Sequence, residues 1–68
     1  MQLSTRNQLK GKIKDIKTGP VSTEVTIEVA GQTLVVASIT TGSADSMGLK
    51  VGDEVSALIK ASSVMIAK

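Results

Sequence analysis

Between positions 21 and 29 the odd positions are apolar except for Thr23, and the even positions are polar. This alternation constrains the fold more than any other feature. The odd positions carry Val, Thr, Val, Ile and Val, and the even positions carry Ser, Glu, Thr and Glu. A period of two residues is typical of a β-strand that turns one face to a core and the other to water. An amphipathic helix would repeat about every 3.6 residues instead. The stretch therefore predicts a half-buried strand, and with it a sheet.

Turn residues divide the remaining chain into short segments that are rich in Val, Ile and Thr. Such segments favour an all-β domain. The predicted strands span 4–16, 21–29, 33–40, 55–60 and 63–67. A type II′ turn with Gly31 and Gln32 at its centre joins the second strand to the third, because that turn takes glycine first. Consecutive apolar residues at 34–37 predict that both faces of the third strand are covered.

The segment 41–49 breaks the strand pattern. Ser43 can cap a short helix over 44–47, and Gly48 can end this helix in the left-handed conformation. Five short strands with one helix between the third and the fourth is the element order of the oligonucleotide/oligosaccharide-binding (OB) barrel. We therefore predict a single all-β domain over 1–68, a five-stranded OB-like Greek-key barrel with that helix. A small open sandwich is the alternative.

The composition argues against several classes of function. The chain has no Phe, Tyr or Trp on which the bases of a nucleic acid could stack. It has no His or Cys, so the commonest general base, the most reactive nucleophile and the usual ligands of a structural metal are missing. No apolar run approaches the roughly 20 residues of a membrane helix. We therefore expect no enzyme, no nucleic-acid partner and no membrane partner.

Small size and the placement of apolar residues predict a homo-oligomer. A chain of 68 residues without Cys has no disulfides, and oligomerisation is a common way to stabilise so small a domain. Leu58 and Ile59 are adjacent, as are the three apolar residues 64–66, and neighbours in a strand face opposite ways. Apolar side chains must therefore also lie on the outside, which is typical of a contact surface.

Each end of the chain places a hydroxyl and a cation two residues apart. Ser4 and Arg6 stand near the start, and Lys60 and Ser62 stand near the end. Residues i and i+2 of a strand share a face, so each pair points one way. If the two ends meet, four donor side chains converge without a carboxylate, and two of them are positively charged. Such a group of donors suits an oxyanion, although Arg6 and Lys60 could equally be solvated strand charges.

Three longer motifs carry a resemblance to a known family. They are STRNQLKG at 4–11, GLKVGDEV at 48–55 and IKASSVM at 59–65. In these motifs the chain resembles the molbindins, the molybdenum-pterin-binding Mop domains of TOBE type, over essentially its whole length. The resemblance implies a cytoplasmic protein that binds molybdate and tungstate without an organic cofactor. It further implies a homohexamer, a trimer of dimers, with the oxyanions between subunits.

The resemblance also implies which residues contact the anion. The family motifs carry over to Ser4, Arg6, Asn7, Thr40, Lys60, Ala61 and Ser62. A second oxyanion site near the three-fold axis maps to Val21, Ser22 and Thr23. No side chain is expected to ligate the metal atom directly. Asn7 could equally bond the backbone at a strand end, and Thr40 could equally serve the entry into the helix.

Residues and resemblance together predict intracellular storage and homeostasis of molybdate. Molybdate is a tetrahedral dianion with acceptor oxygens only, so a site built from donors matches it. The choice of molybdate over sulfate rests on the resemblance. The initial Met and the short stretch after the last predicted strand lead us to expect a stand-alone protein. The alternative function is that of an oligomerising OB-like module that binds nucleic acid or another protein.

Overall fold

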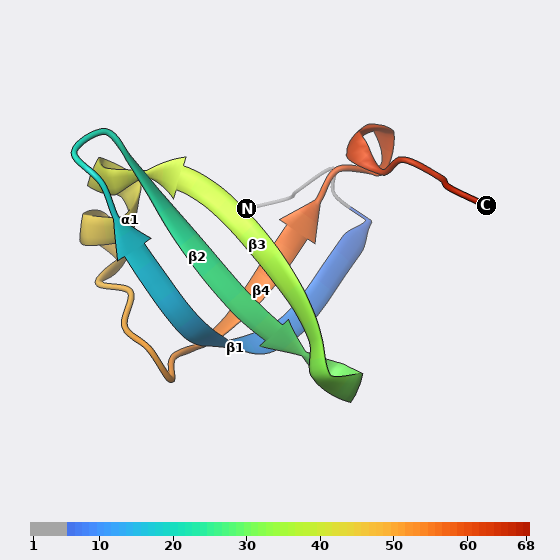
Figure 1. Cartoon of the computed structure of the whole chain (residues 1–68), viewed down its shortest axis with the longest axis horizontal. Coiled ribbons are helices and arrows are strands. Elements are labelled where there is room, and N and C mark those ends of the chain that lie inside the picture. Colours follow the sequence, from blue (N-terminus) through green and yellow to red (C-terminus); the bar gives the residue numbers. More distant parts are fainter. Residues whose placement is uncertain (1–5) are drawn as a thin grey trace.

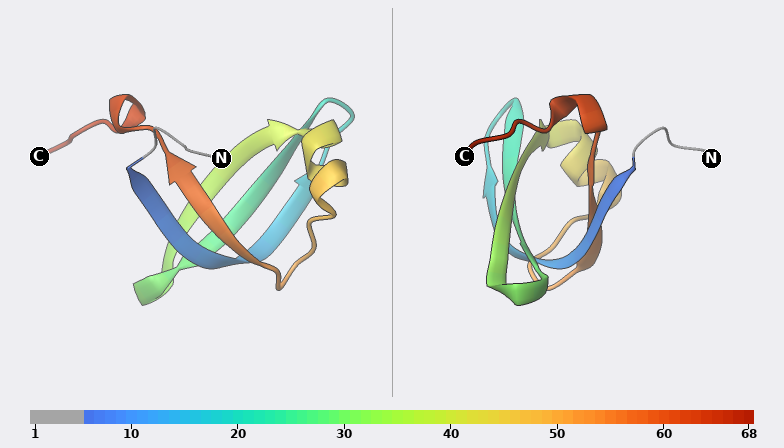
Figure 2. Two further views of the ribbon diagram at one scale, coloured as in Figure 1. Left: turned by 180° about the vertical axis from the view of Figure 1, so that it is seen from behind. Right: turned by 90° about the vertical axis from the view of Figure 1, so that its right-hand side faces the viewer.

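The structure is a computed structural model that describes residues 6–68. Its sheet has four antiparallel strands in the order β3-β2-β1-β4. The strands are β1 (Asn7–Thr18), β2 (Ser22–Val29), β3 (Thr33–Thr40) and β4 (Glu54–Ile59). The sheet curls into a half-barrel, and α1 (Thr41–Met47) lies at one end of it (Figure 1; Figure 2). The predicted all-β fold with a helix between the third and fourth strands is confirmed.

The alternation that predicts the second strand places the core. Along β2 the odd positions Thr23, Val25 and Ile27 are buried, and the even positions are exposed or half-buried. Val25 and Ile27 pack with Ile13 of β1 and Ala57 of β4 in one apolar cluster inside the curl. The core is therefore small, as expected for a domain of this length.

The first strand is long because it serves both halves of the curl. β1 pairs with β4 over its first half and with β2 over its second half, and the register shifts between Ile13 and Asp15. An extra residue of this kind bends a strand and increases its twist. Gly11 sits where the bent strand approaches β2, and a Cβ atom there would overlap the Glu28 carbonyl oxygen. The strand runs to Thr18 rather than ending at 16, and residues 4 and 5 of the predicted strand lie outside the described residues.

The helix begins earlier than the sequence predicts. Thr40 is its N-cap, with Oγ1 accepting a hydrogen bond from the Ser43 backbone N–H at 3.0 Å. Ser43 therefore lies inside the first turn, and its hydroxyl accepts from the Thr40 hydroxyl at 2.8 Å. The prediction that Ser43 caps the helix is therefore wrong. Gly48 ends the helix in the left-handed conformation with φ 61°, so the predicted end is confirmed.

The hairpin between β2 and β3 differs from the predicted turn. Gly31 and Gln32 both have positive φ, at 78° and 63°, whereas a type II′ turn needs a positive φ at its first central residue only. The strand that follows has the predicted bounds. Its residues Leu34 and Val36 remain 52% and 59% exposed, so this face of the strand is open to solvent in the described chain. The expectation that both faces of this strand are covered is wrong for the single chain.

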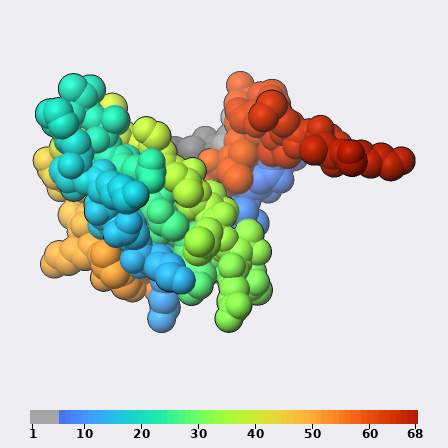
Figure 3. All heavy atoms as spheres, viewed as in Figure 1, coloured from blue at the N-terminus to red at the C-terminus, as the bar shows by residue number. Residues whose placement is uncertain are grey.

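The predicted fifth strand over 63–67 is also wrong for the single chain. After β4 the backbone forms a short 3-10 turn, η2 (Ala61–Ser63), and residues 64–68 form no strand. This tail projects from the body of the molecule (Figure 1; Figure 3), and no strand of the described sheet pairs with it. Met65 and Ile66 are 92% and 90% exposed. A strand needs a neighbour for its backbone groups, and residues 6–68 offer none at this place. The described sheet is thus a four-stranded half-barrel.

Candidate functional site

The two ends of the sequence meet within one chain. Asn7, the first residue of β1, pairs with Ile59, the last residue of β4. Arg6 therefore directly precedes this pair on one strand and Lys60 directly follows it on the other. Figure 1 shows the start of β1 and the end of β4 side by side, away from α1. We call Arg6, Lys60 and the turn Ala61–Ser63 the cationic end.

A side-chain hydrogen bond closes the ladder at this point. The half-buried Asn7 donates from Nδ2 to the backbone carbonyl oxygen of Ile59 at 3.0 Å. Asn7 thus makes a strand-end bond to the backbone. The sequence alone does not decide between this role and a contact to the anion.

The backbone after Lys60 forms a 3-10 turn over Ala61–Ser63 and does not continue the strand. The Ser63 N–H donates to the Lys60 carbonyl oxygen at 2.8 Å, and the Val64 N–H donates to the Ala61 carbonyl oxygen at 3.3 Å. The N–H groups of Ala61 and Ser62 stand at the start of this 3-10 turn, where a helical turn supplies no acceptor. Because the strand ends at Ile59, the expectation that Lys60 and Ser62 share a strand face does not apply. Ser4 lies outside the described residues.

No acidic side chain of the described residues forms an ion pair with the cationic end. Within residues 6–68, the one ion pair joins Lys14 Nζ and Glu28 Oε2 at 3.4 Å, on the exposed outer surface. Arg6 and Lys60 are exposed and belong to no ion pair of the described chain. The cationic end therefore offers positive charge and N–H donors to a ligand, with no carboxylate competing for them.

Thr40 lies at the other end of the molecule. It pairs with Ser22 at the start of β2, and β2 pairs there with the far end of β1, at Thr18. Asn7 and the cationic end stand at the opposite end of β1. Within one chain Thr40 is thus not brought to Arg6 and Lys60, and its hydroxyl is engaged with Ser43.

The second predicted oxyanion site falls at the start of β2, with Val21 directly before the strand and Ser22 and Thr23 as its first residues. Val21 and Ser22 are exposed there, whereas Thr23 is 1% exposed. The Thr23 hydroxyl lies 2.9 Å from that of Thr41, which itself donates to the Gly19 carbonyl oxygen at 2.6 Å. Thr41 belongs to this network although no sequence motif singles it out. The run of hydroxyl residues at the helix entry was the available signal, but it does not say which hydroxyl turns inward.

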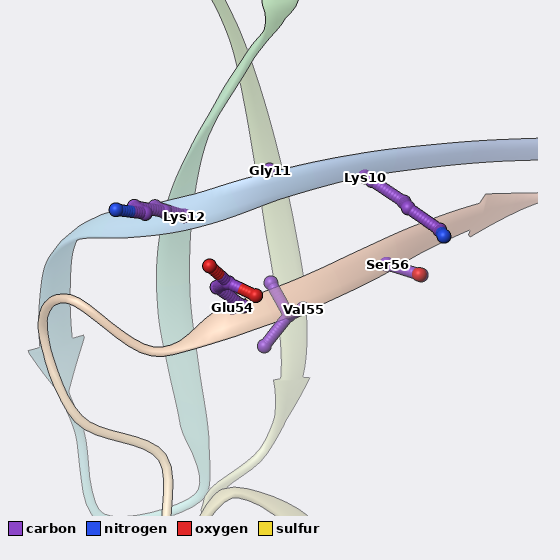
Figure 4. A pocket seen from close by; sticks show the side chains of 6 residues that line it. All are labelled: Lys10, Gly11, Lys12, Glu54, Val55 and Ser56. Atoms are coloured by element: carbon purple, nitrogen blue, oxygen red, sulfur yellow. The ribbon is translucent and has the colours of Figure 1, made fainter.

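A hollow on the outer face of β1 and β4 gathers two further lysines (Figure 4). Lys10 and Lys12 point away from one another there, and the Glu54 carboxylate lies between them. Glu54 is the partner of Lys12 across the ladder. An acid within the cluster repels a dianion, so this hollow suits an oxyanion less well than the cationic end does.

The described side chains offer few other chemistries. No helix in residues 6–68 is long and apolar enough to cross a membrane. In the same part of the chain, no three His, Cys, Asp or Glu side chains gather as a metal site would require. The hydroxyl, carboxamide, guanidinium and ammonium groups are the polar groups left to consider as donors to a ligand.

A curled all-β sheet with an acid-free cationic end defines a small ligand-binding domain. The family model described as TOBE domain matches residues 3–66, and the chain belongs to this family and to its molbindin (Mop) group. It is 46% identical over 66 residues to molybdenum-pterin-binding protein 3 of Clostridium pasteurianum, covering 97% of both chains. It is also 46% identical over 66 residues to the molybdenum transport protein ModE of Herbaspirillum seropedicae, of which it spans 24%.

Solved structures share the fold. A molybdate-binding protein from Sporomusa ovata superposes with a TM-score of 0.94 at 35% identity, with both chains fully covered. The cytoplasmic molybdate-binding protein ModG, solved with molybdate bound, superposes with a TM-score of 0.91 at 43% identity. That match covers 96% of this chain and 46% of ModG. The family predicted from the three sequence motifs is therefore confirmed.

Proposed function

We propose that this protein binds molybdate and tungstate oxyanions at the subunit interfaces of a homo-oligomer, and so stores them and regulates their free concentration in the cytoplasm. One observation carries the proposal. Arg6 and Lys60 both stand directly beyond the Asn7–Ile59 pair, one on each strand, and no acid of the described chain forms an ion pair with them. The names of the relatives add the identity of the anion, since those proteins are described as binding molybdenum, with a pterin, or molybdate.

The chemistry of the cationic end matches a tetrahedral dianion. The Arg6 guanidinium offers N–H groups in a fixed fork, and Lys60 offers three rotatable ones. Ser4, Ser62 and the backbone N–H groups of Ala61 and Ser62 add uncharged donors. Charge-assisted hydrogen bonds are each worth about 1.5–3 kcal/mol. Four or five of them, less the costs of ordering and desolvation, would give roughly micromolar affinity, about −8 kcal/mol.

Thr40 joins this site only through a second chain. It lies at the far end of β1 from Arg6, so a Thr40 that contacts the same anion belongs to a neighbouring subunit. An anion held between subunits also relieves the repulsion between neighbouring cations, and binding would then stabilise the assembly by mass action. The second oxyanion site would use exposed Ser22 and Val21, with Thr23 serving as its support.

The half-barrel itself supports association. β3 and β4 each have a strand neighbour on one side only, and an apolar groove runs between them, lined by residues that include Val35, Ile39 and Ile59. The tail of the chain exposes Val64, Met65 and Ile66. A fifth strand formed between copies would cover these side chains and pair the free edges. The proposed assembly is the homohexamer of the family, a trimer of dimers, and it needs no organic cofactor and no turnover.

Titration calorimetry tests the proposal. The purified protein is titrated with molybdate, tungstate, sulfate and phosphate at matched ionic strength, and its mass is measured by light scattering after gel filtration. We expect tight binding of the first two anions, much weaker binding of the others, and a mass several times that of one chain. A monodisperse monomer that responds to none of the four anions would overturn the proposal.

A further inference from the structure

Asn7 is the side chain that links the two strands of the cationic end. Its Nδ2 donates to the Ile59 carbonyl oxygen at 3.0 Å, across a sequence separation of 52 residues. β1 begins at Asn7 and β4 ends at Ile59, so this bond stands at the last rung of the ladder. The carbonyl that it holds belongs to the residue directly before Lys60.

The amide is poorly arranged to be a ligand itself. A carboxamide carries its donors on nitrogen and an acceptor on oxygen. Asn7 commits one of its two Nδ2 N–H groups to Ile59, so only one N–H is left for a ligand, and it stands beside an oxygen that an oxyanion repels. The backbone of Arg6 and the turn after Lys60 are, in contrast, both attached directly to the bonded pair.

The last rung of a ladder is where strands fray most readily. Here the fraying has an added cause, because Arg6 and Lys60 carry like charges at the next position of the two strands, just beyond the same end of this pair. Without an anion these charges push the two strand ends apart. A side-chain bond across that rung opposes the separation, and it also fixes the carbonyl from which the turn Ala61–Ser63 starts.

We propose that Asn7 is a positioning residue that holds the Arg6 end of β1 against the Lys60 turn, rather than a ligand of the anion. This inference rests on the proposed function, because the object that Asn7 positions is the oxyanion site. By holding the two strand ends together, Asn7 fixes the donors in place before the anion arrives. This preorganisation lowers the entropy cost of ordering them on binding.

Matched variants test the affinity. Asn7→Leu keeps the bulk of the side chain and removes the hydrogen bond. Leu9→Ala is the control, because Leu9 stands two residues further along the same ladder, opposite Ala57, and its truncation leaves the bond intact. We expect Asn7→Leu to weaken molybdate binding about three- to tenfold, the equivalent of one ordinary hydrogen bond, and Leu9→Ala to leave it within twofold. Equal losses in the two variants would refute the positioning role.

A spectroscopic signature separates positioning from direct contact. The chain contains a single Asn, so selective ¹⁵N-asparagine labelling gives one side-chain NH2 pair in the NMR spectrum of the whole protein. We expect this NH2 group to stay protected from solvent exchange, with little change in shift, as molybdate is added. A large shift with loss of protection would mean that the amide leaves Ile59 for the anion, and the inference would be wrong.

A third measurement does not depend on the anion. The Ser63 N–H closes the turn onto the Lys60 carbonyl at 2.8 Å, and its hydrogen exchange reports whether the turn is held. Hydrogen exchange of the Ser63 N–H should be at least about threefold faster in Asn7→Leu than in Leu9→Ala. A threefold change is close to the smallest effect expected from the loss of one hydrogen bond. Unchanged exchange in Asn7→Leu contradicts the inference. If the wild-type protein binds no molybdate, the proposed function fails, while the exchange of Ser63 still decides whether Asn7 holds the turn.

Discussion

The hydroxyl groups of Thr23 and Thr41 lie 2.9 Å apart and join β2 to the first residue of α1. Thr41 donates its own hydrogen to the Gly19 carbonyl oxygen, so Thr23 is the donor between the two hydroxyls. The Thr41 backbone N–H donates to the Val21 carbonyl oxygen at 2.9 Å. These bonds fasten the connection between β1 and β2, and with it the second candidate site at the start of β2, to the start of the helix.

Replacing Thr41 by Val should destabilise the protein. The substitution keeps the shape and leaves the buried Thr23 hydroxyl without an acceptor, which costs about 1–3 kcal/mol of unfolding free energy. Urea unfolding followed by circular dichroism measures the change. Thr33→Val is the control, because Thr33 is exposed at the start of β3, and its effect should stay within about 0.5 kcal/mol. Similar stabilities for the two variants would show that the Thr23–Thr41 bond contributes little.

Gly11→Ala should be among the most disruptive single-methyl substitutions in the chain. The added Cβ would overlap the Glu28 carbonyl oxygen, a backbone atom held in the sheet, so one of the strands must shift. Overpacking of this kind costs about 1–3 kcal/mol. Gly42→Ala is the matched control: nothing lies within 4 Å of its Cβ position, and a helical glycine gains about 0.5–1 kcal/mol on becoming alanine. The unfolding free energies should therefore move in opposite directions.

The structure makes Thr40 the cap of α1, and a pair of alanine variants can verify this. Thr40→Ala removes the acceptor of the Ser43 N–H and should cost about 0.5–2 kcal/mol of unfolding free energy. Ser43→Ala leaves that acceptor in place and should cost less, since it removes only the bond between the two exposed hydroxyls. A larger loss in Ser43→Ala than in Thr40→Ala would restore the cap that the sequence predicts.

Local patterns were sufficient where a segment's own residues decide its structure. The alternation at 21–29 places the buried side chains of β2, and Gly48 ends the helix as expected because only a residue tolerant of positive φ fits there. The start of the helix was not decided locally. Thr40, Thr41 and Ser43 are all competent caps, and the bonds of Thr41 to Gly19 and Val21 select among them. That selection depends on tertiary contacts that a linear pattern does not contain.

The candidate site, too, could be predicted from the sequence only in part. The motifs at the two ends predict an oxyanion site on the condition that the two ends meet, and the pairing of Asn7 with Ile59 places Arg6 and Lys60 at the adjoining ends of neighbouring strands. The position of Thr40 at the opposite end of β1 follows from the strand register, which no motif encodes. Apolar residues at 64–66 carry the composition of a strand, but composition does not say which chain supplies the neighbouring strand. The four-stranded sheet of one copy therefore could not be told from a closed barrel.

Removing the charge of Lys60 should weaken anion binding without destabilising the empty protein. Lys60→Met keeps most of the aliphatic stem and removes one charge-assisted hydrogen bond, worth about 1.5–3 kcal/mol, so molybdate affinity should fall about 10- to 100-fold. The melting temperature without anion should hold or rise, because the repulsion of Arg6 disappears. Lys12→Met, beside Glu54 on the outer face, is the control and should leave the affinity unchanged. Equal losses for both lysines would indicate general electrostatic attraction instead of a site at the cationic end.

Charging the exposed tail should dissociate the proposed homo-oligomer. Met65 and Ile66 are 92% and 90% exposed in the single chain, so Ile66→Lys costs nothing in a free tail. If the tail packs on a second copy, the same change buries an unpaired ammonium, which is strongly unfavourable. Val51→Lys is the control, because Val51 is 62% exposed in the turn before β4 and outside the tail. Light scattering should give a smaller mass for Ile66→Lys and an unchanged mass for Val51→Lys. A full-sized assembly of Ile66→Lys would exclude the tail from the interface.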